Sequence, residues 1–449
     1  MKTIYGENMK KEKNTKVIIS PYIYIMLSFL GVIILGSILL YLPISLQDGV
    51  TLPYIDSLFL SASATCVTGL STIANINETF TYFGKIVLIF LMEIGGLSIV
   101  TIASFLLVLF GKKMGFSSKF FLTSALNQNS QKGIIVFLKK VVFMSLIIQG
   151  LFLIFNTIIL SKYYDNFISL FGVAIFHTVS SFNNAGFDIF GSSSMINYST
   201  DIWLNITTML EIVLGGLGFL VLGEIILLPF QKRLSFHSKV VLLFTLVLIL
   251  IPMVIFRFTM NITWLEALFT SVTARTAGFT TIDFATKMNE TAAYPIMLIL
   301  MFIGASPGST GGGVKTTTFF TIIITIIYAC IGKKPKAFKR NIAQESITKS
   351  FALIMISLAY VLTLIVLLKI FEKAIPFTSL MFEAFSALGT VGVSMGITQS
   401  LTIASKILII ITMFVGRIGP LSFVSFWSHS FMEEKSANVR YVEEKITIG

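Results

Sequence analysis

The chain has 449 residues, of which 55% are hydrophobic and 12% are charged, and its formal net charge is +12. Soluble globular domains carry about twice that share of charged residues, so the composition excludes a soluble protein. The positive charge is gathered in a few segments, which is typical of the cytoplasmic loops of membrane proteins and argues against nucleic-acid binding. These segments are Lys10–Lys16, Lys112–Lys140, Lys232–Lys239 and Lys333–Lys349.

Apolar segments long enough to cross the hydrocarbon core recur along the whole chain. The first follows the basic residues 1–16 without a small-residue cleavage site, so we expect a retained helix and not a signal peptide. The sequence predicts eight membrane spans, at residues 17–44, 80–110, 134–161, 202–229, 238–258, 291–331, 350–371 and 401–427.

A shorter apolar element, which ends in small polar residues and a glycine, follows each odd-numbered span. A single element of this kind is more simply a tight turn between two helices. Four elements at equivalent positions instead indicate four repeats of helix, re-entrant loop and helix. Few lysines lie between an odd and the next even span, so the loops enter from the outer face and both termini are cytoplasmic. The element ends are "SATCVTG" (63–69), "SSFNNAG" (180–186), "VTARTAG" (272–278) and "SALGTVG" (386–392).

The predicted fold is therefore an all-α membrane protein with eight transmembrane helices and four re-entrant pore loops around one central pore. We expect it to be a multi-pass membrane protein. Its predicted parts are a cytoplasmic tail at 1–16, pore repeats at 17–115, 116–234, 235–340 and 341–432, and a cytoplasmic tail at 433–449.

Four re-entrant segments around one axis favour a cation pathway. Non-helical backbone is tolerated at membrane depth only where protein or water covers it, and converging carbonyl oxygens can replace the water shell of a cation. The four elements carry no full row of acidic side chains, so backbone oxygens are the expected ligands. Glu93 and Glu211 lie in predicted spans. We expect them to form structural hydrogen bonds with neighbouring loops, and direct contact with an ion is the alternative.

Six motifs together resemble one family of ion transporters. They are "SSFNNAGFDIF", "ARTAGFTTID", "SALGTVGVSMG", "PGSTGGGVKTTT", "VGRIGPLSF" and "RYVEEKITIG". The chain resembles the Trk/Ktr/HKT superfamily of potassium transporters along its whole length, and most closely the Ktr-type membrane subunits KtrB and KtrD. The resemblance implies passive, channel-like uptake of potassium through four non-identical pore units.

The resemblance also implies which residues form the selectivity filter. Arg275 is unexpected in a cation filter, and we expect its side chain to turn away from the axis toward acidic neighbours. Plant relatives replace the first filter glycine with serine, so Gly69 favours potassium. The implied filter residues are Cys66, Val67, Thr68 and Gly69; Asn183, Asn184, Ala185 and Gly186; Arg275, Thr276, Ala277 and Gly278; and Gly389, Thr390, Val391 and Gly392.

The stretch "GASPGSTGGGVK" at residues 304–315 interrupts the sixth predicted span. Pro307 removes a backbone donor and breaks the helix, so a loop is expected below the filter. Its glycine spacing suggests a phosphate-binding loop, but Val314 separates the last glycine from Lys315 and no strand precedes it.

In the resembling family this loop is the gate. Lys315 is expected to hold it through acidic partners, and Arg417 is expected to raise the barrier to cations, with a salt bridge inside the bundle as the alternative. The implied gate residues are Gly304, Ala305, Ser306, Pro307, Gly308, Ser309, Thr310, Gly311, Gly312, Gly313, Lys315 and Arg417.

The resemblance implies partners as well. Ktr-type membrane subunits form homodimers on a cytoplasmic nucleotide-binding subunit of the KtrA or KtrC kind. This chain has no strand, "GxGxxG" and helix unit of its own, so nucleotide regulation would come from that partner. We expect the tail at Glu443–Lys445 to insert at a dimer or partner interface, with a solvated terminus as the alternative. We expect no resident cofactor, and sodium is a candidate activator.

Two alternative functions remain open from the sequence. A sodium-permeable or weakly selective cation transporter would use the same architecture. A membrane enzyme or pump would need clusters of acid, base or nucleophilic residues, or a soluble catalytic domain. The sequence has no such cluster, and the three histidines lie far apart without metal-ligand spacing.

Overall fold

The computed structural model describes residues 21–111, 114–126, 131–288 and 291–419. Within these ranges the fold is helical, apart from the two-residue strands β1 (Lys336–Ala337) and β2 (Arg340–Asn341), which pair as an antiparallel hairpin. The predicted tails at 1–16 and 433–449, including Glu443–Lys445, lie outside the described residues.

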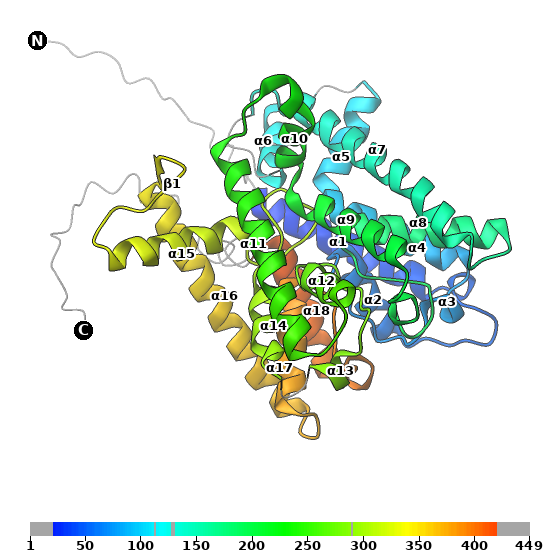
Figure 1. The fold of residues 1–449 in the computed structure, drawn as a ribbon. Helices are drawn as coiled ribbons and strands as arrows, with labels where there is room; N and C mark the ends of the chain where they lie inside the picture. Colours follow the sequence, from blue (N-terminus) through cyan, green and yellow to red (C-terminus); the bar gives the residue numbers. More distant parts are fainter. Residues whose placement is uncertain (1–20, 112–113, 127–130, 289–290, 420–449) are drawn as a thin grey trace, which may run out of the picture.

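Four uninterrupted helices are long and apolar enough to cross a membrane, and they match the odd-numbered predicted spans (Figure 1). They are α1 (Pro21–Tyr41), α7 (Ile134–Leu160), α11 (Phe236–Thr259) and α16 (Gln344–Phe371).

The even-numbered spans are not straight. The second span bends by 94° between α4 (Tyr82–Leu97) and α5 (Ile99–Leu109), and the fourth bends by 105° between α9 (Ile202–Leu217) and α10 (Phe219–Gln231). The sequence analysis treated each of these as one continuous span.

The bends have a common backbone cause. Ser98 has a φ of +72° and Gly218 a φ of +92°, a conformation that cannot continue a right-handed helix. Gly419, with a φ of +98°, ends α18 (Ile403–Ile418) in the same way. Each of these residues is the third after a glycine of the repeated glycine-rich stretch: Gly95, Gly215 and Gly416.

The sixth span contains the break expected from Pro307 and the glycines around it. It consists of α14 (Ala293–Phe302), a loop, and α15 (Thr316–Cys330). Figure 1 shows that α15 and the β1–β2 hairpin project to one side of the other helices.

Four short helices precede the predicted re-entrant segments. Each packs against a long helix of its own repeat, as α2 does against α1 and α12 against α11. Local sequence features mark where three of these helices begin. Pro53 precedes α2 and Pro376 precedes α17, and Thr263 and Glu266 form a capping box at the start of α12. The four helices are α2 (Tyr54–Thr65), α8 (Phe167–Phe182), α12 (Trp264–Thr273) and α17 (Phe377–Gly389).

Minor elements complete the described part of the chain. They are α3 (Ile76–Thr79), α6 (Phe116–Ala125), α13 (Phe284–Lys287), and the 3₁₀ turns η1 (Pro43–Ser45), η2 (Ile196–Tyr198) and η3 (Thr398–Ser400).

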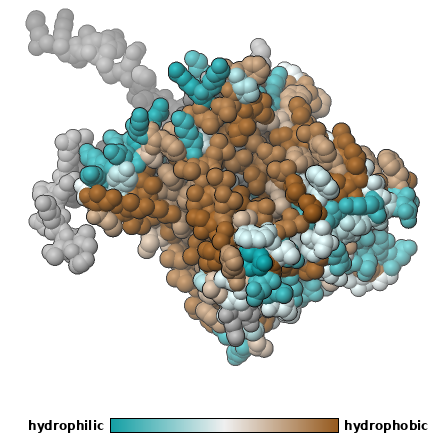
Figure 2. All heavy atoms as spheres, in the orientation of Figure 1, coloured by the Kyte–Doolittle hydropathy of each residue, from teal (hydrophilic) through white to brown (hydrophobic). Residues whose placement is uncertain are grey.

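Helix α7 shows the inverted polarity of a membrane protein. It buries Gln149 and Asn156, with exposed fractions of 8% and 0%, whereas Ile147 and Ile158 are 68% and 65% exposed. Such a face suits contact with lipid, because contact of this apolar surface with water is unfavourable. Figure 2 shows the same pattern over the visible face, with a broad hydrophobic area and hydrophilic residues at its edges.

Candidate ion-binding site and gate

The four segments that follow the short helices share one backbone pattern. In each segment the last glycine and the residue two positions before it have positive φ values. Alternating the sign of φ turns successive peptide planes, so that neighbouring carbonyl oxygens can face the same side. The paired residues are Val67 and Gly69, Asn184 and Gly186, Thr276 and Gly278, and Thr390 and Gly392.

The four glycines form a closed cycle of contacts. A Cβ atom on Gly69 would lie 2.7 Å from the Ala185 oxygen, and a Cβ on Gly186 would lie 2.7 Å from the Ala277 oxygen. In the same way, a Cβ on Gly278 would lie 2.9 Å from the Val391 oxygen, and a Cβ on Gly392 would lie 3.0 Å from the Gly69 Cα. The filter segments predicted from the sequence therefore meet at one place, and a side chain at any of the four glycines would push against the neighbouring segment.

Hydrogen bonds hold each segment against its own short helix. The backbone N–H groups of Thr68, Ala185 and Val391 each donate to a serine carbonyl five residues earlier, at 2.8 Å. The third segment differs, because Ala277 N–H donates to the Thr273 carbonyl at 3.1 Å. These bonds engage N–H groups within each segment, and the carbonyl oxygens lie beside the neighbouring glycines.

The short helices add to the electrostatics of this cycle. All four end where the glycine segments begin, with caps at Cys66, Asn183, Ala274 and Thr390. A helix C-terminus carries a partial negative charge. Four such ends directed at one place favour a cation there without any carboxylate at the site.

Glu93 and Glu211 accept hydrogen bonds from side chains, and Glu93 thereby contacts Asn183, the first residue of the second predicted filter segment. Glu93 accepts hydrogen bonds from Asn183 at 2.7 Å and from Gln149 at 3.2 Å, and Glu211 accepts one from Asn156 at 3.1 Å. Gln149 and Asn156 were missed by the sequence analysis, although polar residues in an apolar helix are a recognisable signal.

Arg275 departs from expectation. Its side chain is buried, but no carboxylate of the described residues lies within ion-pair distance of it. It borders a small cavity together with Thr245, Ile249 and Ile212, and its Nε has no hydrogen-bond partner in the described part of the chain. The expected acidic neighbours were wrong, because the helices that pack here contribute apolar and hydroxyl side chains.

The loop between α14 and α15 is hydrogen-bonded to two other repeats, the second and the fourth. Ser306 and Thr310 donate backbone N–H groups to the Gly216 and Gly215 carbonyls at 3.0 and 3.2 Å, and Gly313 donates to the Gly416 carbonyl at 3.1 Å. The Gly312 N–H donates to the Thr390 hydroxyl of the fourth glycine segment at 3.1 Å. The loop thus lies directly against the glycine cycle.

The two cations of the predicted gate both bind backbone oxygens. Lys315 Nζ donates to the Gly311 carbonyl at 2.7 Å, so the expectation of acidic partners was wrong. Arg417 donates to the carbonyls of Thr310, Gly95 and Gly96. None of the ion pairs among the described residues includes Arg417, so they give no support to the alternative of a salt bridge. Carbonyls serve as partners because the glycine-rich loop exposes backbone and carries no carboxylate.

Comparison with known families decides the class of the chain. The family model described as TrkH, cation transport protein, matches residues 8–437. The chain belongs to the TrkH family. This is a family of ion transporters and not of enzymes, as the sequence predicted.

Relatives of this TrkH-family chain match it over almost its full length. Ktr system potassium uptake protein B of Bacillus subtilis is 37% identical, over 98% of this chain and 100% of that protein. Potassium/sodium uptake protein NtpJ of Enterococcus hirae is 35% identical, over 98% of this chain and 99% of that protein. The crystal structure of the potassium transporter TrkH from Vibrio parahaemolyticus has the same fold, with a TM-score of 0.71 at 18% identity, and the alignment covers 95% of this chain and 88% of that one.

A buried ion pair in this TrkH-family chain joins its first and last repeats. Lys406 Nζ on α18 lies 2.6 Å from Asp56 Oδ1 in the first turn of α2, and the two side chains are only 11% and 12% exposed. The sequence analysis did not single out either residue, because a pair separated by 350 positions has no local signature.

Replacing Asp56 by alanine is expected to destabilise the protein by about 3 kcal/mol, because the Lys406 ammonium then stays buried without its partner. The measurement is the apparent unfolding temperature of the purified protein in detergent. Lys349→Ala is the control, since the Glu345–Lys349 pair is exposed (76% and 65%) and should contribute about 0–1 kcal/mol. Equal effects of the two substitutions would contradict the structural role of the Asp56–Lys406 pair.

Proposed function

We propose that the chain is the ion-translocating subunit of a Ktr-type potassium uptake system in the bacterial plasma membrane. The closed cycle of Gly69, Gly186, Gly278 and Gly392 carries this proposal. It supports a pore built from four re-entrant loops, one in each repeat, with both termini in the cytoplasm. The relatives named for potassium uptake support the choice of ion.

The proposed mechanism is passive conduction through a filter of backbone oxygens. A potassium ion loses water as it enters, and the carbonyls of the segments ending at the four glycines replace that water. The filter residues are those of positions 66–69, 183–186, 275–278 and 389–392. The negative ends of α2, α8, α12 and α17 favour the ion at this point.

The proposed gate is the loop at residues 304–315, held by Arg417. Its hydrogen bonds to the second and fourth repeats support this role, because they place backbone directly beside the glycine cycle. The positive charge of Arg417 would raise the barrier to a cation while the loop stays in place.

Assembly and regulation are part of the same proposal. The chain would act as a homodimer with a cytoplasmic nucleotide-binding subunit of the KtrA or KtrC kind, and sodium would act as an activator. The relatives called Ktr system proteins support a multi-subunit arrangement by their names. A second candidate, a pathway that also admits sodium, is supported by the similarity to the potassium/sodium uptake protein.

Expression of the chain together with a Ktr-type nucleotide-binding subunit is expected to restore growth of a potassium-uptake-deficient bacterium at low external potassium. Growth rate against potassium concentration is the measurement. A variant with aspartate at Gly392, where any Cβ meets the Gly69 Cα at 3.0 Å, is the matched control and should not grow. Absence of rescue by the wild-type pair, with both proteins present in the membrane, would contradict uptake.

Ion flux into vesicles that contain the purified protein shows whether potassium alone or both potassium and sodium pass. Under the main proposal, a potassium gradient drives ion flux and a sodium gradient alone drives little. Comparable fluxes under the two gradients would favour the sodium-permeable alternative.

A further inference from the structure

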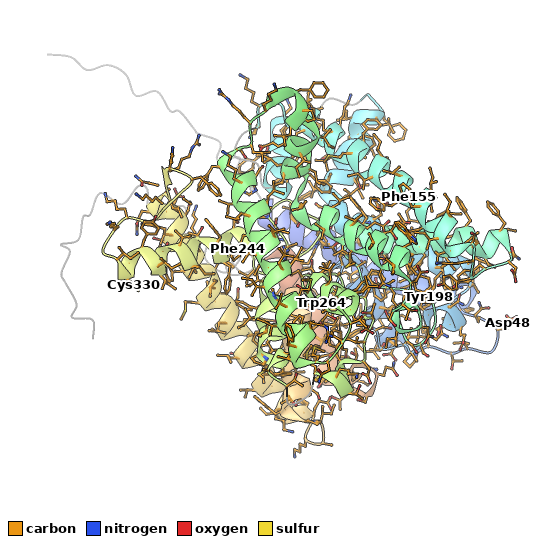
Figure 3. The ribbon with its side chains drawn as sticks, in the orientation of Figure 1. Asp48, Phe155, Tyr198, Phe244, Trp264 and Cys330 are labelled. Atoms are coloured by element: carbon orange, nitrogen blue, oxygen red, sulfur yellow. The ribbon has the colours of Figure 1, made fainter. Side chains whose placement is uncertain are left out.

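A cavity of about 390 Å³, lined by both polar and apolar side chains, lies between α11, α15 and α16, and no residue of the glycine cycle lines it. Its lining includes His237 of α11, Thr317 and Thr318 of α15, Asn341 of the hairpin, and Ser346 and Ser350 of α16. Figure 3 labels Phe244 on the side of α11 that faces α15, where its ring lies 5.8 Å from the ring of Phe320.

Three helices begin at this cavity. Helix α11 begins at Phe236, α15 at Thr316 and α16 at Gln344, and residues from the first two turns of each line the cavity. The first backbone N–H groups of a helix lack partners inside the helix and carry partial positive charge. Side chains cap α11, through Ser235, but not α15 or α16. Some of the first N–H groups of α15 and α16 donate to backbone carbonyls, Thr318 to Lys315 and Ser346 to Ala343, both at 3.0 Å. The partial positive charge of the helix starts still favours an anion in the cavity.

Ser350 provides an independent sign of a ligand. It is only 8% exposed and lines the cavity, yet its hydroxyl has no hydrogen-bond partner among the described residues. A helical serine ordinarily donates to the carbonyl four residues earlier, as Ser357 of the same helix does to Leu353 at 2.7 Å. The Ser350 hydroxyl is not among the fully buried oxygens without a partner, so it keeps accessible surface. Because Ser350 lines the cavity, this hydroxyl is available to a molecule there.

The surrounding charge is positive. The hairpin that contributes Asn341 and the two lysines before it carry five exposed cations. The ring of Phe338 at the hairpin tip lies 6.3 Å from the ring of Phe236 on α11, measured between centroids. The two nearby carboxylates are already engaged, since Glu345 bonds Lys349 at 2.6 Å and Glu224 accepts the Ser235 N–H at 2.8 Å. The five cations are Lys333, Lys334, Lys336, Lys339 and Arg340.

We propose that this cavity binds a phosphate group, which comes from the headgroup of an anionic phospholipid or from soluble phosphate. Hydroxyls, helix N-termini and a basic rim are the donors that phosphate oxygens require. The lipid source is favoured by the apolar surface beside the cavity, where Ile326 and Ile327 of α15 are 51% and 47% exposed. The proposal concerns binding and does not depend on which ion the protein carries.

Native mass spectrometry of the purified full-length protein tests the proposal. The probes are dioleoyl phosphatidylglycerol and dioleoyl phosphatidylcholine, which differ in headgroup charge and share their acyl chains. The wild-type protein is expected to retain phosphatidylglycerol preferentially. The double variant Thr318→Val/Ser350→Ala should bind it about tenfold more weakly or worse, since hydrogen bonds to a charged group are lost.

The chain offers a matched control with the same substitutions on the same two helices. Thr325→Val/Ser357→Ala removes hydroxyls that bond their own helix, Thr325 to the Thr321 carbonyl and Ser357 to the Leu353 carbonyl, both at 2.7 Å. This control should bind as the wild type does. A hydroxyl-retaining variant, Thr318→Ser/Ser350→Thr, should also bind and guards against loss of binding through misfolding.

The source of the phosphate is decided by a second arm, in which inorganic phosphate alone is added and the unfolding temperature is followed. A rise in the wild type but not in Thr318→Val/Ser350→Ala, without lipid retention, supports the site and assigns it to soluble phosphate. Equal retention of phosphatidylglycerol by the double variant and its control, or no response of the wild type to either probe, would overturn the proposal.

Discussion

Gly186→Ser is expected to weaken the apparent potassium affinity by about tenfold or more, a change of about 1.4 kcal/mol, and to let sodium pass. Gly186 has a φ of +71°, and a Cβ there would lie 2.7 Å from both the Ala277 oxygen and the Gly278 Cα. The serine must therefore displace the third segment, and its hydroxyl adds a ligand that does not distinguish the two ions as a complete set of carbonyls does.

The measurement is flux into vesicles with potassium and sodium gradients imposed separately. Gly172→Ser is the matched control, because Gly172 lies in α8 of the same repeat and a Cβ there has no atom within 4 Å. The control should leave both fluxes unchanged. If Gly186→Ser also left selectivity unchanged, that glycine would not belong to the filter.

Arg417→Ala is expected to raise potassium flux by about tenfold or more. The guanidinium holds the carbonyls of Thr310, Gly95 and Gly96, and a hydrogen bond to a charged group contributes about 1.5–3 kcal/mol. Its loss frees the loop at residues 304–315 and, under the proposed function, removes a positive charge from the ion's route. Deletion of Ser306–Gly313 should also raise the flux, because it removes the proposed gate.

Arg417→Lys separates the two effects of the arginine. A lysine keeps the positive charge, but its single ammonium cannot span the carbonyls that the planar guanidinium joins. An intermediate flux is expected if both the charge and the tether restrain the ion. Unaltered flux in both Arg417→Ala and the loop deletion would end the gate proposal.

The sequence was sufficient to locate the features that depend on local chemistry. Glycines and small polar residues recur at fixed distances after the odd spans, and each repeated end falls where the structure has a glycine with positive φ. The break at residues 304–315 was also predictable, because Pro307 and the glycines around it cannot form a helix within an apolar span.

Other features depend on contacts that no sequence pattern reports. Hydropathy cannot distinguish the bent second and fourth spans from straight ones, because both halves of each are apolar. Ser98 in particular has a positive φ, which is uncommon for a residue with a side chain and which its sequence context does not indicate. The carbonyl partners of Lys315 and Arg417, and the burial of Arg275 away from carboxylates, likewise arise from packing between distant repeats.

The link between the first and last repeats has a consequence for biosynthesis. Asp56 and Lys406 are 350 positions apart, so at 5–20 residues per second a ribosome makes the lysine about 20–70 s after the aspartate. During that time Asp56 lacks its counter-ion, and the cycle of glycine contacts lacks Gly392. Both the ion pair and the closed cycle can therefore form only when translation is almost complete.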